Sequence, residues 1–262
     1  MFPTIASLLA TVLYCLSAFL ISRQLGDPAQ PRWKPLAPAV LAILVHAVVL
    51  NHIIYGPEGL NLGLFVVLSL ICWLISIQIL LSCIYHRVES LGIAIFPVSG
   101  LAGLISSLGL SEHLIATGSE VIQGHIMVSV IAYSLIMLGA CQAALLAYQD
   151  HSIRSHHPGG FIRFLPPLHE METLLFQILS FGFIALSASL ITGFFFLEDI
   201  FAQHLVHKTV LSIVGWFILG TLLFGRFQFG WRGKTAIRWT LSSFGFLMLA
   251  FFGSKLVLEF IL

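Results

Sequence analysis

The sequence predicts an all-α polytopic membrane protein, a bundle of eight transmembrane helices. Of its 262 residues, 58% are hydrophobic and only 9% are charged, and a soluble domain could not bury that much apolar surface. The hydrophobic residues form runs of about 20, the length that crosses a hydrocarbon core about 30 Å thick. Only short loops separate these runs, so residues 1–262 are expected to form a single integral membrane domain.

The hydrophobic runs favour helices over strands. They lack the alternating polar period of a membrane strand, and in lipid each backbone amide has to be paired within its own segment. Arg23 follows the first run and no basic residue precedes it, which is opposite to a cleaved secretory signal and predicts a retained helix. In chain order, the predicted helices cover residues 3–22, 36–54, 62–83, 90–109, 124–148, 172–196, 205–225 and 236–257.

The basic residues predict that both termini lie on the outer, periplasmic side. Lys and Arg collect in cytoplasmic loops, and all but Lys208 and Lys255 fall in or beside alternate loops. The sequence therefore predicts a multi-pass protein of the bacterial inner membrane. Its net charge of +1 gives no indication of a basic surface for nucleic acid. The residues assigned to the inner side are Arg23, Arg32, Lys34, Arg87, Arg154, Arg163, Arg226, Arg232, Lys234 and Arg238.

Histidines near the outer ends of the apolar runs are the main functional candidates, because an imidazole in lipid is costly. His125 opens the fifth run, and Ser129 and Tyr133 follow at steps of four, on one helical face. Such a polar stripe has to face protein or a cavity. The alternative is an interfacial histidine bonded to its neighbours, with the serine and tyrosine joining helices.

Two further histidines compete for a role beside His125. His46 lies about two turns below the outer end of the second run and needs either a ligand or a carbonyl or hydroxyl of a neighbouring helix. His207 begins the seventh run next to Lys208. Alternatively, His207 is an ordinary histidine of the outward loop, and Lys208 extends its amine to the membrane surface.

Two or three imidazoles without a carboxylate cage suit heme b. Its porphyrin face is apolar, its iron accepts axial histidine, and its propionates need polar or cationic partners at the water boundary. We therefore expect His125, His46 and His207 as candidate iron ligands and Ser129 and Tyr133 near the cofactor. Lys208 and Lys255 are candidate propionate partners, with anchoring of the outer helix ends as the alternative.

Two loops are longer than the others. The outward loop, residues 110–123, is expected to form a partly ordered cap. The inward loop, residues 149–171, holds several histidines that could bind a metal, with a solvated cytoplasmic loop as the alternative. Glu170 and Glu172 at its end are expected to be favourable charges at a helix N-terminus. Walker, GxGxxG, GxSxG and HExxH motifs are absent, so no enzymatic activity is expected.

Several segments of the second half resemble the CcsA-type cytochrome c assembly protein family. Gly124-His125-Ile126 with Ser129, Ala132 and Tyr133 resembles its histidine helix, LHxxxSxxAY, and Lys208, Thr209 and Trp216 stand at the spacing of its KET and following Trp. The segment 230–233 resembles its GWRG turn, and 245–256 resembles its last helix. The helix count is similar to the family's short branch of YpjD-like and HemX-like inner membrane proteins.

The resemblance implies that His125 is an external-side heme ligand. Residues 197–208 hold no tryptophan, so the family's tryptophan-rich loop, which presents heme to apocytochrome, is missing. The expected function is a non-catalytic heme-binding protein that assists cytochrome c biogenesis or heme homeostasis. The alternatives are a permease component, whose polar stripe lines a substrate path, and a scaffold for a membrane or cytoplasmic partner such as a heme-pathway enzyme.

Overall fold

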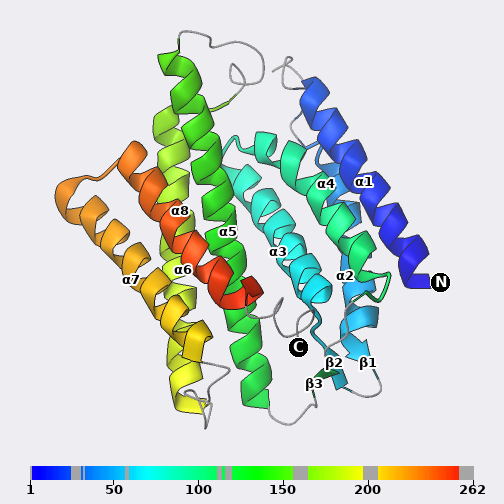
Figure 1. The fold of residues 1–262 in the computed structure, drawn as a ribbon. Coiled ribbons are helices and arrows are strands. Elements are labelled where there is room, and N and C mark those ends of the chain that lie inside the picture. The colour runs from blue at the N-terminus through cyan, green and yellow to red at the C-terminus, as the bar shows by residue number, and fades with distance from the viewer. Residues whose placement is uncertain are drawn as a thin grey trace. The chain divides into compact units, whose positions relative to one another are not determined.

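The computed structural model describes residues 2–24, 31, 33–56, 59–110, 114–115, 120–155, 165–196 and 206–253. It is an all-α fold with eight helices long and apolar enough to cross a membrane (Figure 1). They are α1 (Phe2–Gln24), α2 (Ala37–Ile54), α3 (Leu64–Tyr85), α4 (Glu89–Ser106), α5 (Glu120–Arg154), α6 (Leu168–Phe196), α7 (Val206–Phe229) and α8 (Lys234–Met248).

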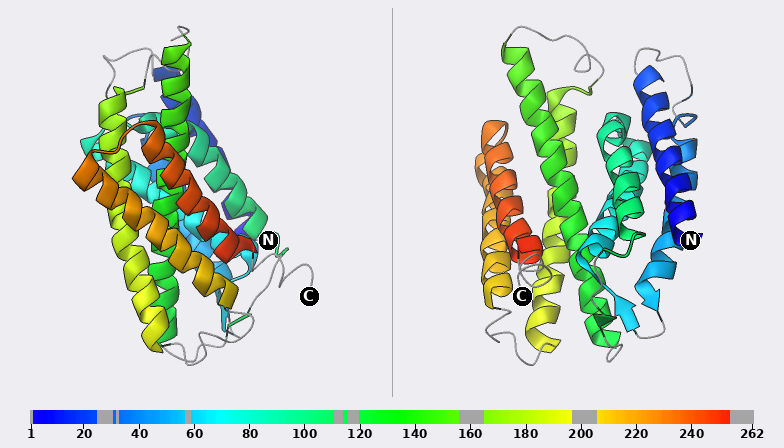
Figure 2. Two further views of the ribbon diagram at one scale, coloured as in Figure 1. Left: turned by 60° about the vertical axis from the view of Figure 1, so that its left-hand side comes forward. Right: turned by 45° about the vertical axis from the view of Figure 1, so that its right-hand side comes forward.

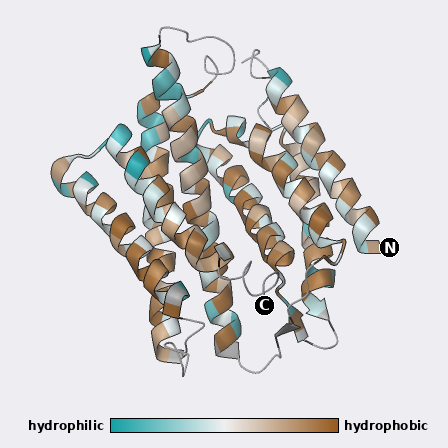
Figure 3. Cartoon of the chain, in the orientation of Figure 1, coloured by the Kyte–Doolittle hydropathy of each residue, from teal (hydrophilic) through white to brown (hydrophobic). Residues whose placement is uncertain are grey.

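All eight predicted helices are confirmed, and the outward orientation of the termini stays a prediction. Hydrophobic residues occupy most of the length of each helix, whereas hydrophilic residues gather where α5 ends and α6 begins (Figure 3). One difference from prediction is in α5, which continues to Arg154 rather than ending at residue 148. Arg154 donates two hydrogen bonds of 2.9 Å to the Asp150 carboxylate one turn earlier, and such pairs favour helix.

The last helix also differs from the uniform helix predicted for residues 236–257. The α-helix ends at Met248, and a π-helical turn, η2 (Leu249–Gly253), follows it. Wider turns of this kind are rare and occur most often at functional sites.

The chain divides into two compact units. Unit 1 comprises residues 1–117 with 164–166, and unit 2 comprises residues 118–163 with 167–262. Unit 1 contains α1–α4, and unit 2 contains α5–α8 and η2. The sequence patterns did not predict this division, because apolar runs show where helices lie but not which helices pack together.

In unit 1, α1 and α3 each pack against both α2 and α4 (Figure 2). Small residues allow close approach between α1 and α4. A Cβ added to Gly100 would stand 2.8 Å from the Thr11 Cα, and the Thr11 hydroxyl donates to the Gly100 carbonyl at 2.9 Å. The α1–α4 contact therefore depends on the missing side chain at position 100.

Gly100→Ala is expected to lower the free energy of unfolding of the full chain by about 1–3 kcal/mol, the usual cost of overpacking a tight contact. Thermal unfolding in detergent would measure it. The control is Gly245→Ala in α8, where an added Cβ meets nothing within 4 Å, so the change should be neutral or stabilise the helix by up to about 1 kcal/mol. Equal melting temperatures for the two variants would contradict the close α1–α4 contact.

A small sheet closes one end of unit 1. Its strands, β1 (Tyr55–Gly56), β2 (Gly59–Asn61) and β3 (Leu114–Ile115), are antiparallel in the order β1-β2-β3. Leu60 pairs with both Tyr55 and Ile115. The outward loop 110–123 thus contributes a strand to the α2–α3 connection, which gives the predicted ordered cap a defined form over the residues that the structure describes.

In unit 2, α5 packs against α6 and α8, and α7 packs against α8 and α6 (Figure 2). Polar contacts join the helices. The Trp216 indole N–H donates to the Ser187 hydroxyl at 2.8 Å, and its ring stacks on Phe183. The Ser243 hydroxyl of α8 donates to the Gly215 carbonyl of α7 at 2.8 Å. Such hydrogen bonds replace the hydrophobic driving force that lipid removes.

Candidate functional site

His125 lies near the start of α5, half-buried against the end of α6. Its Nδ1 is 2.9 Å from the Thr192 hydroxyl oxygen. A Cβ added to the next residue, Gly193, would stand 3.1 Å from the imidazole Cε1. The ring is therefore held from one side by a hydroxyl and by a glycine that leaves room for it.

The Thr192 hydroxyl favours a proton on His125 Nδ1. Its oxygen is 2.9 Å from the Ala188 carbonyl and 3.0 Å from the Ser189 carbonyl, which can only accept. The single hydroxyl proton is thus donated to the backbone, and the oxygen accepts from His125 Nδ1–H. In this tautomer Nε2 keeps its lone pair.

The rest of the predicted polar stripe has partners in unit 2. The Ser129 hydroxyl donates to the His125 carbonyl at 2.7 Å and is 2.7 Å from the Ser189 hydroxyl. It therefore joins α5 to α6, as the alternative interpretation of the stripe expected. The Tyr133 ring packs on Phe251 of η2 with centroids 5.0 Å apart, so the π-helical turn is placed against the stripe.

One of the cationic candidates, Lys208, lies where α7 begins, at the end of unit 2 where α5 also begins (Figure 1). Lys208 is half-buried in the first turn of α7, and it has no carboxylate partner within 4.0 Å among the residues described. His207 belongs to the same turn, but its side chain lies outside the described residues, as does Lys255.

His46 belongs to unit 1 and is almost fully buried, with 1% of its surface exposed. Its Nε2 is 2.8 Å from the Ser69 hydroxyl of α3, and its Nδ1 is 3.4 Å from the Tyr14 hydroxyl of α1. A Cβ added to Gly103 of α4 would stand 3.0 Å from Nε2. Both nitrogens are engaged, which favours the alternative of a histidine satisfied by neighbouring hydroxyls. A role as heme ligand stays a prediction and would require loss of the Ser69 bond.

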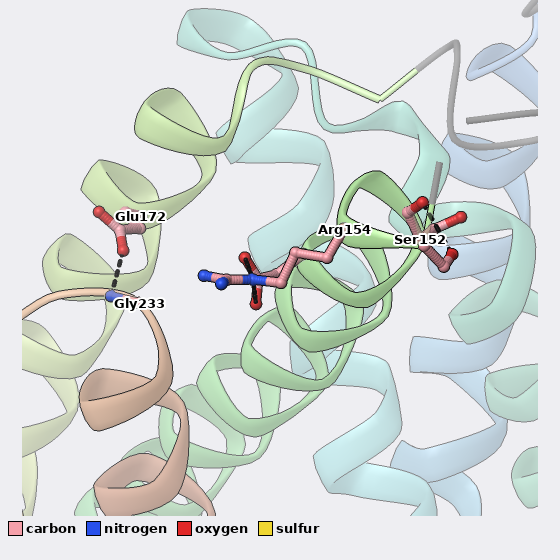
Figure 4. Close-up of polar contacts among 6 residues, drawn as sticks. Ser152, Arg154, Glu172 and Gly233 are labelled. Carbon is pink, nitrogen blue, oxygen red and sulfur yellow. Dashed lines mark hydrogen bonds and ion pairs between the residues drawn. The ribbon is translucent and has the colours of Figure 1, made fainter. Parts of the chain in front are cut away.

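The partners of these histidines were not predicted. Thr192 and Ser189 follow Ser187 in α6 and precede Gly193, and this stripe of small polar residues in an apolar run was an available signal. Glu172 was predicted as a favourable charge at the start of its own helix. Its carboxylate also accepts a hydrogen bond from the Gly233 amide at the start of α8 (Figure 4), so it joins α6 to the α7–α8 turn.

The inward histidine loop is only partly described. His151 lies in the last turn of α5 and His169 in the first turn of α6, both exposed, whereas His156 and His157 lie outside the described residues. The described part of the chain contains no group of three His, Cys, Asp or Glu residues that could hold a metal ion. Metal binding by this loop stays a prediction.

Comparison with known proteins identifies the family. Residues 33–262 match the Cytochrome C assembly protein family. The inner membrane protein YpjD of Escherichia coli K12 is 32% identical over 267 residues, which cover 97% of this chain and 98% of YpjD. An uncharacterised 28.8 kDa protein of Azospirillum brasilense is 34% identical over 140 residues, 53% of this chain and 52% of that protein. No solved structure matches the chain.

These findings bear out two predictions from the sequence. The eight membrane spans and the inner membrane relative confirm the predicted localisation as a multi-pass inner membrane protein. The resemblance seen in the histidine helix and in the segments that follow it is confirmed over nearly the whole chain. The chain belongs to the cytochrome c assembly protein family.

Proposed function

We propose that this protein binds heme b through His125 and assists cytochrome c biogenesis or heme homeostasis without catalysing a reaction. The observation that carries the proposal is the hydrogen bond from His125 Nδ1–H to Thr192. Metal-ligating histidines characteristically donate their second ring N–H to a fixed acceptor, which orients the ring and raises the basicity of the ligating nitrogen. Here the acceptor is a hydroxyl whose own proton is committed to the backbone.

The surroundings of His125 suit a flat, apolar ligand. A Cβ added to the preceding residue, Gly124, would meet nothing within 4 Å, so the helix surface next to His125 is open at this position. An axial histidine beside an open, apolar helix surface is what the binding of a porphyrin face requires. When bound, heme would supply an iron that accepts the Nε2 lone pair.

Lys208 suits the polar edge of the same ligand. It is half-buried at the end of unit 2 where α5 begins, and a cation that lacks a carboxylate partner among the described residues is a suitable partner for a propionate. The second axial position would go to His207, its neighbour in the sequence, rather than to His46, whose nitrogens are both engaged. Lys255 remains a candidate for the second propionate.

A heme site of this kind would suit a role in cytochrome c assembly. Proteins that assemble cytochrome c handle heme at the outer face of the membrane, which is the side predicted for His125. The tryptophan-free segment 197–208 favours holding heme over presenting it to an apocytochrome. Partners would be other cytochrome c assembly components or an enzyme of the heme pathway.

Absorption spectroscopy on the full chain, expressed with ample heme supply and purified in detergent, tests the proposal. The purified protein is expected to carry a stoichiometric amount of heme, seen as a Soret band. The band should shift on reduction in the way typical of axial histidine ligation. The His207→Ala variant should change the spectrum of the ligated iron, and His46→Ala should leave it unchanged. Purified protein that carries no heme, and does not take up added hemin, would refute the proposal.

A further inference from the structure

The α7–α8 turn, residues 230–233, is a rigid structure. Gly230 has φ +65° and its amide donates to the Arg226 carbonyl at 3.1 Å, which ends α7 in the left-handed conformation that favours glycine. The Trp231 amide donates to the Gly225 carbonyl at 3.2 Å, and Gly233 again has a positive φ of +55°. Two left-handed glycines thus reverse the chain within four residues.

Side chains from three helices hold this turn in place. Glu172 of α6, 9% exposed, accepts from the Gly233 amide (Figure 4). Arg226 of α7 lies over the Phe176 ring at 4.6 Å and donates to the Trp231 carbonyl at 3.2 Å. The Trp231 ring packs on Trp239 of α8, with centroids 5.4 Å apart. Contacts therefore hold Gly230, Trp231 and Gly233 in place.

The side chains that point outward from this rigid turn are cationic. Arg232, Lys234 and Arg238 are exposed, and none has a carboxylate within 4.0 Å among the residues that the structure describes. Lys234 and Arg238 are four residues apart and share a face of α8. The first turn of α8 contains no acidic residue. Since none of the three cations forms an ion pair within the described residues, a bound anion would add a favourable interaction with them.

Exposed aromatic side chains adjoin these cations. Phe227 is 86% exposed and Phe229 is 70% exposed at the end of α7. Phe229 lies against Trp231, with ring centroids 6.4 Å apart. We name the set Arg232, Lys234, Arg238, Phe227 and Phe229 the basic-aromatic surface. A small anion would neutralise its cations but leave its rings in water, whereas a lipid carries both a phosphate and acyl chains.

We propose that the basic-aromatic surface binds an anionic phospholipid, with the phosphate at Arg232, Lys234 and Arg238 and the acyl chains along Phe227 and Phe229. The surface lies on the side predicted to be cytoplasmic, so the lipid belongs to the inner leaflet. Binding would anchor α7 and α8 at the membrane boundary, at the opposite end of unit 2 from the start of α5 (Figure 1). This role does not depend on heme binding.

Native mass spectrometry of the full chain in detergent, with phosphatidylglycerol and phosphatidylcholine added in equal amounts, tests the proposal. The wild-type chain should retain phosphatidylglycerol preferentially. The triple variant R232Q/K234Q/R238Q should lose this preference by about tenfold or more, since each cation near a lipid surface contributes substantially. The matched control R23Q/K34Q/R87Q removes three exposed cations of unit 1 and should keep it.

Glu172→Gln distinguishes lipid binding that depends on the structure of the turn from binding that depends only on net charge. It removes a negative charge near the surface, so charge alone predicts tighter phosphatidylglycerol binding. A turn held by the Glu172 carboxylate predicts weaker binding instead, because Gly233 loses a charged acceptor. F227A/F229A should weaken the binding of phosphatidylglycerol. The much weaker binding of glycerol phosphate, a soluble headgroup probe, should stay the same in this variant.

Several outcomes would overturn the proposal. Equal loss of lipid preference in the two triple variants would show general attraction to basic residues. Tighter binding by Glu172→Gln would show that the turn has no role. Displacement of phosphatidylglycerol by equimolar glycerol phosphate would show a site for small anions. Melting temperatures of all variants serve to confirm that each is folded.

Discussion

His125→Ala is expected to abolish heme retention by the purified chain. The axial ligand itself is lost, so the fall in affinity should exceed the roughly 100-fold that residues supporting a ligand contribute at most. Hemin titration followed by the Soret band would measure it. His125→Gln keeps a polar side chain of similar reach but provides no imidazole lone pair, so it should fail as well. A His125→Ala protein that still binds heme with wild-type affinity would contradict the assignment.

Thr192 is expected to raise heme affinity through the imidazole tautomer that it favours at His125. Thr192→Val keeps the shape of the side chain but removes the acceptor for His125 Nδ1–H, and heme affinity should fall by about 10- to 100-fold. Thr192→Ser restores the acceptor and most of the affinity. Thr221→Val in α7, where the hydroxyl is exposed and donates to its own helix, is the matched control and should have no effect.

The protonation of His125 provides a readout that needs no heme. Nitrogen NMR of the heme-free protein should show the proton on Nδ1 in the wild-type chain and a mixture of tautomers in Thr192→Val. If Thr192→Val altered the tautomer but bound heme normally, Thr192 would have no role in heme binding. An Nδ1–H tautomer in a protein that never binds heme would leave the hydrogen bond intact but refute the proposed function.

The sequence predicted the eight helices because a membrane span depends on a local property, an apolar run long enough to cross the hydrocarbon core. It predicted that His125 and Ser129 share a face because helical periodicity is also local. Helix ends were harder. The polar residues 149–154 read as a loop, yet they continue α5 with the support of the Asp150–Arg154 pair.

Contacts between segments far apart in the sequence could not be predicted in the same way. The pairing of β3 with β2 joins residues more than 50 positions apart, and two-residue strands have no recognisable pattern. Thr192 meets His125 only because the end of α6 packs on the start of α5. The same holds for Ser69 and His46, whose helices pack within unit 1. Identifying a partner needs the arrangement of helices, whereas identifying a candidate needs only the residue type and its depth in the membrane.

His46→Ala is expected to destabilise the full chain by about 2–4 kcal/mol. It empties a buried site and leaves the Ser69 and Tyr14 hydroxyls without their imidazole partner, and each buried polar group left unpaired costs about 1–3 kcal/mol. In membrane proteins the loss of a hydrogen bond costs less, about 0.6 kcal/mol on average. The cavity left by the imidazole adds to this cost. Unfolding in mixed micelles with increasing SDS would measure the change.

The order of effects among the partners of His46 distinguishes a structural histidine from a heme ligand. Ser69→Ala should cost more than Tyr14→Phe, because the Ser69 contact is 2.8 Å and the Tyr14 contact 3.4 Å. His52→Ala, an exposed histidine of the same helix, should change stability by less than about 0.5 kcal/mol. A heme ligand would show the reverse pattern: His46→Ala would lose heme while the heme-free chain kept its stability. Since His46 joins α1, α2 and α3 through its two nitrogens, we expect stability to fall first and heme binding to be unaffected in the fraction that remains folded.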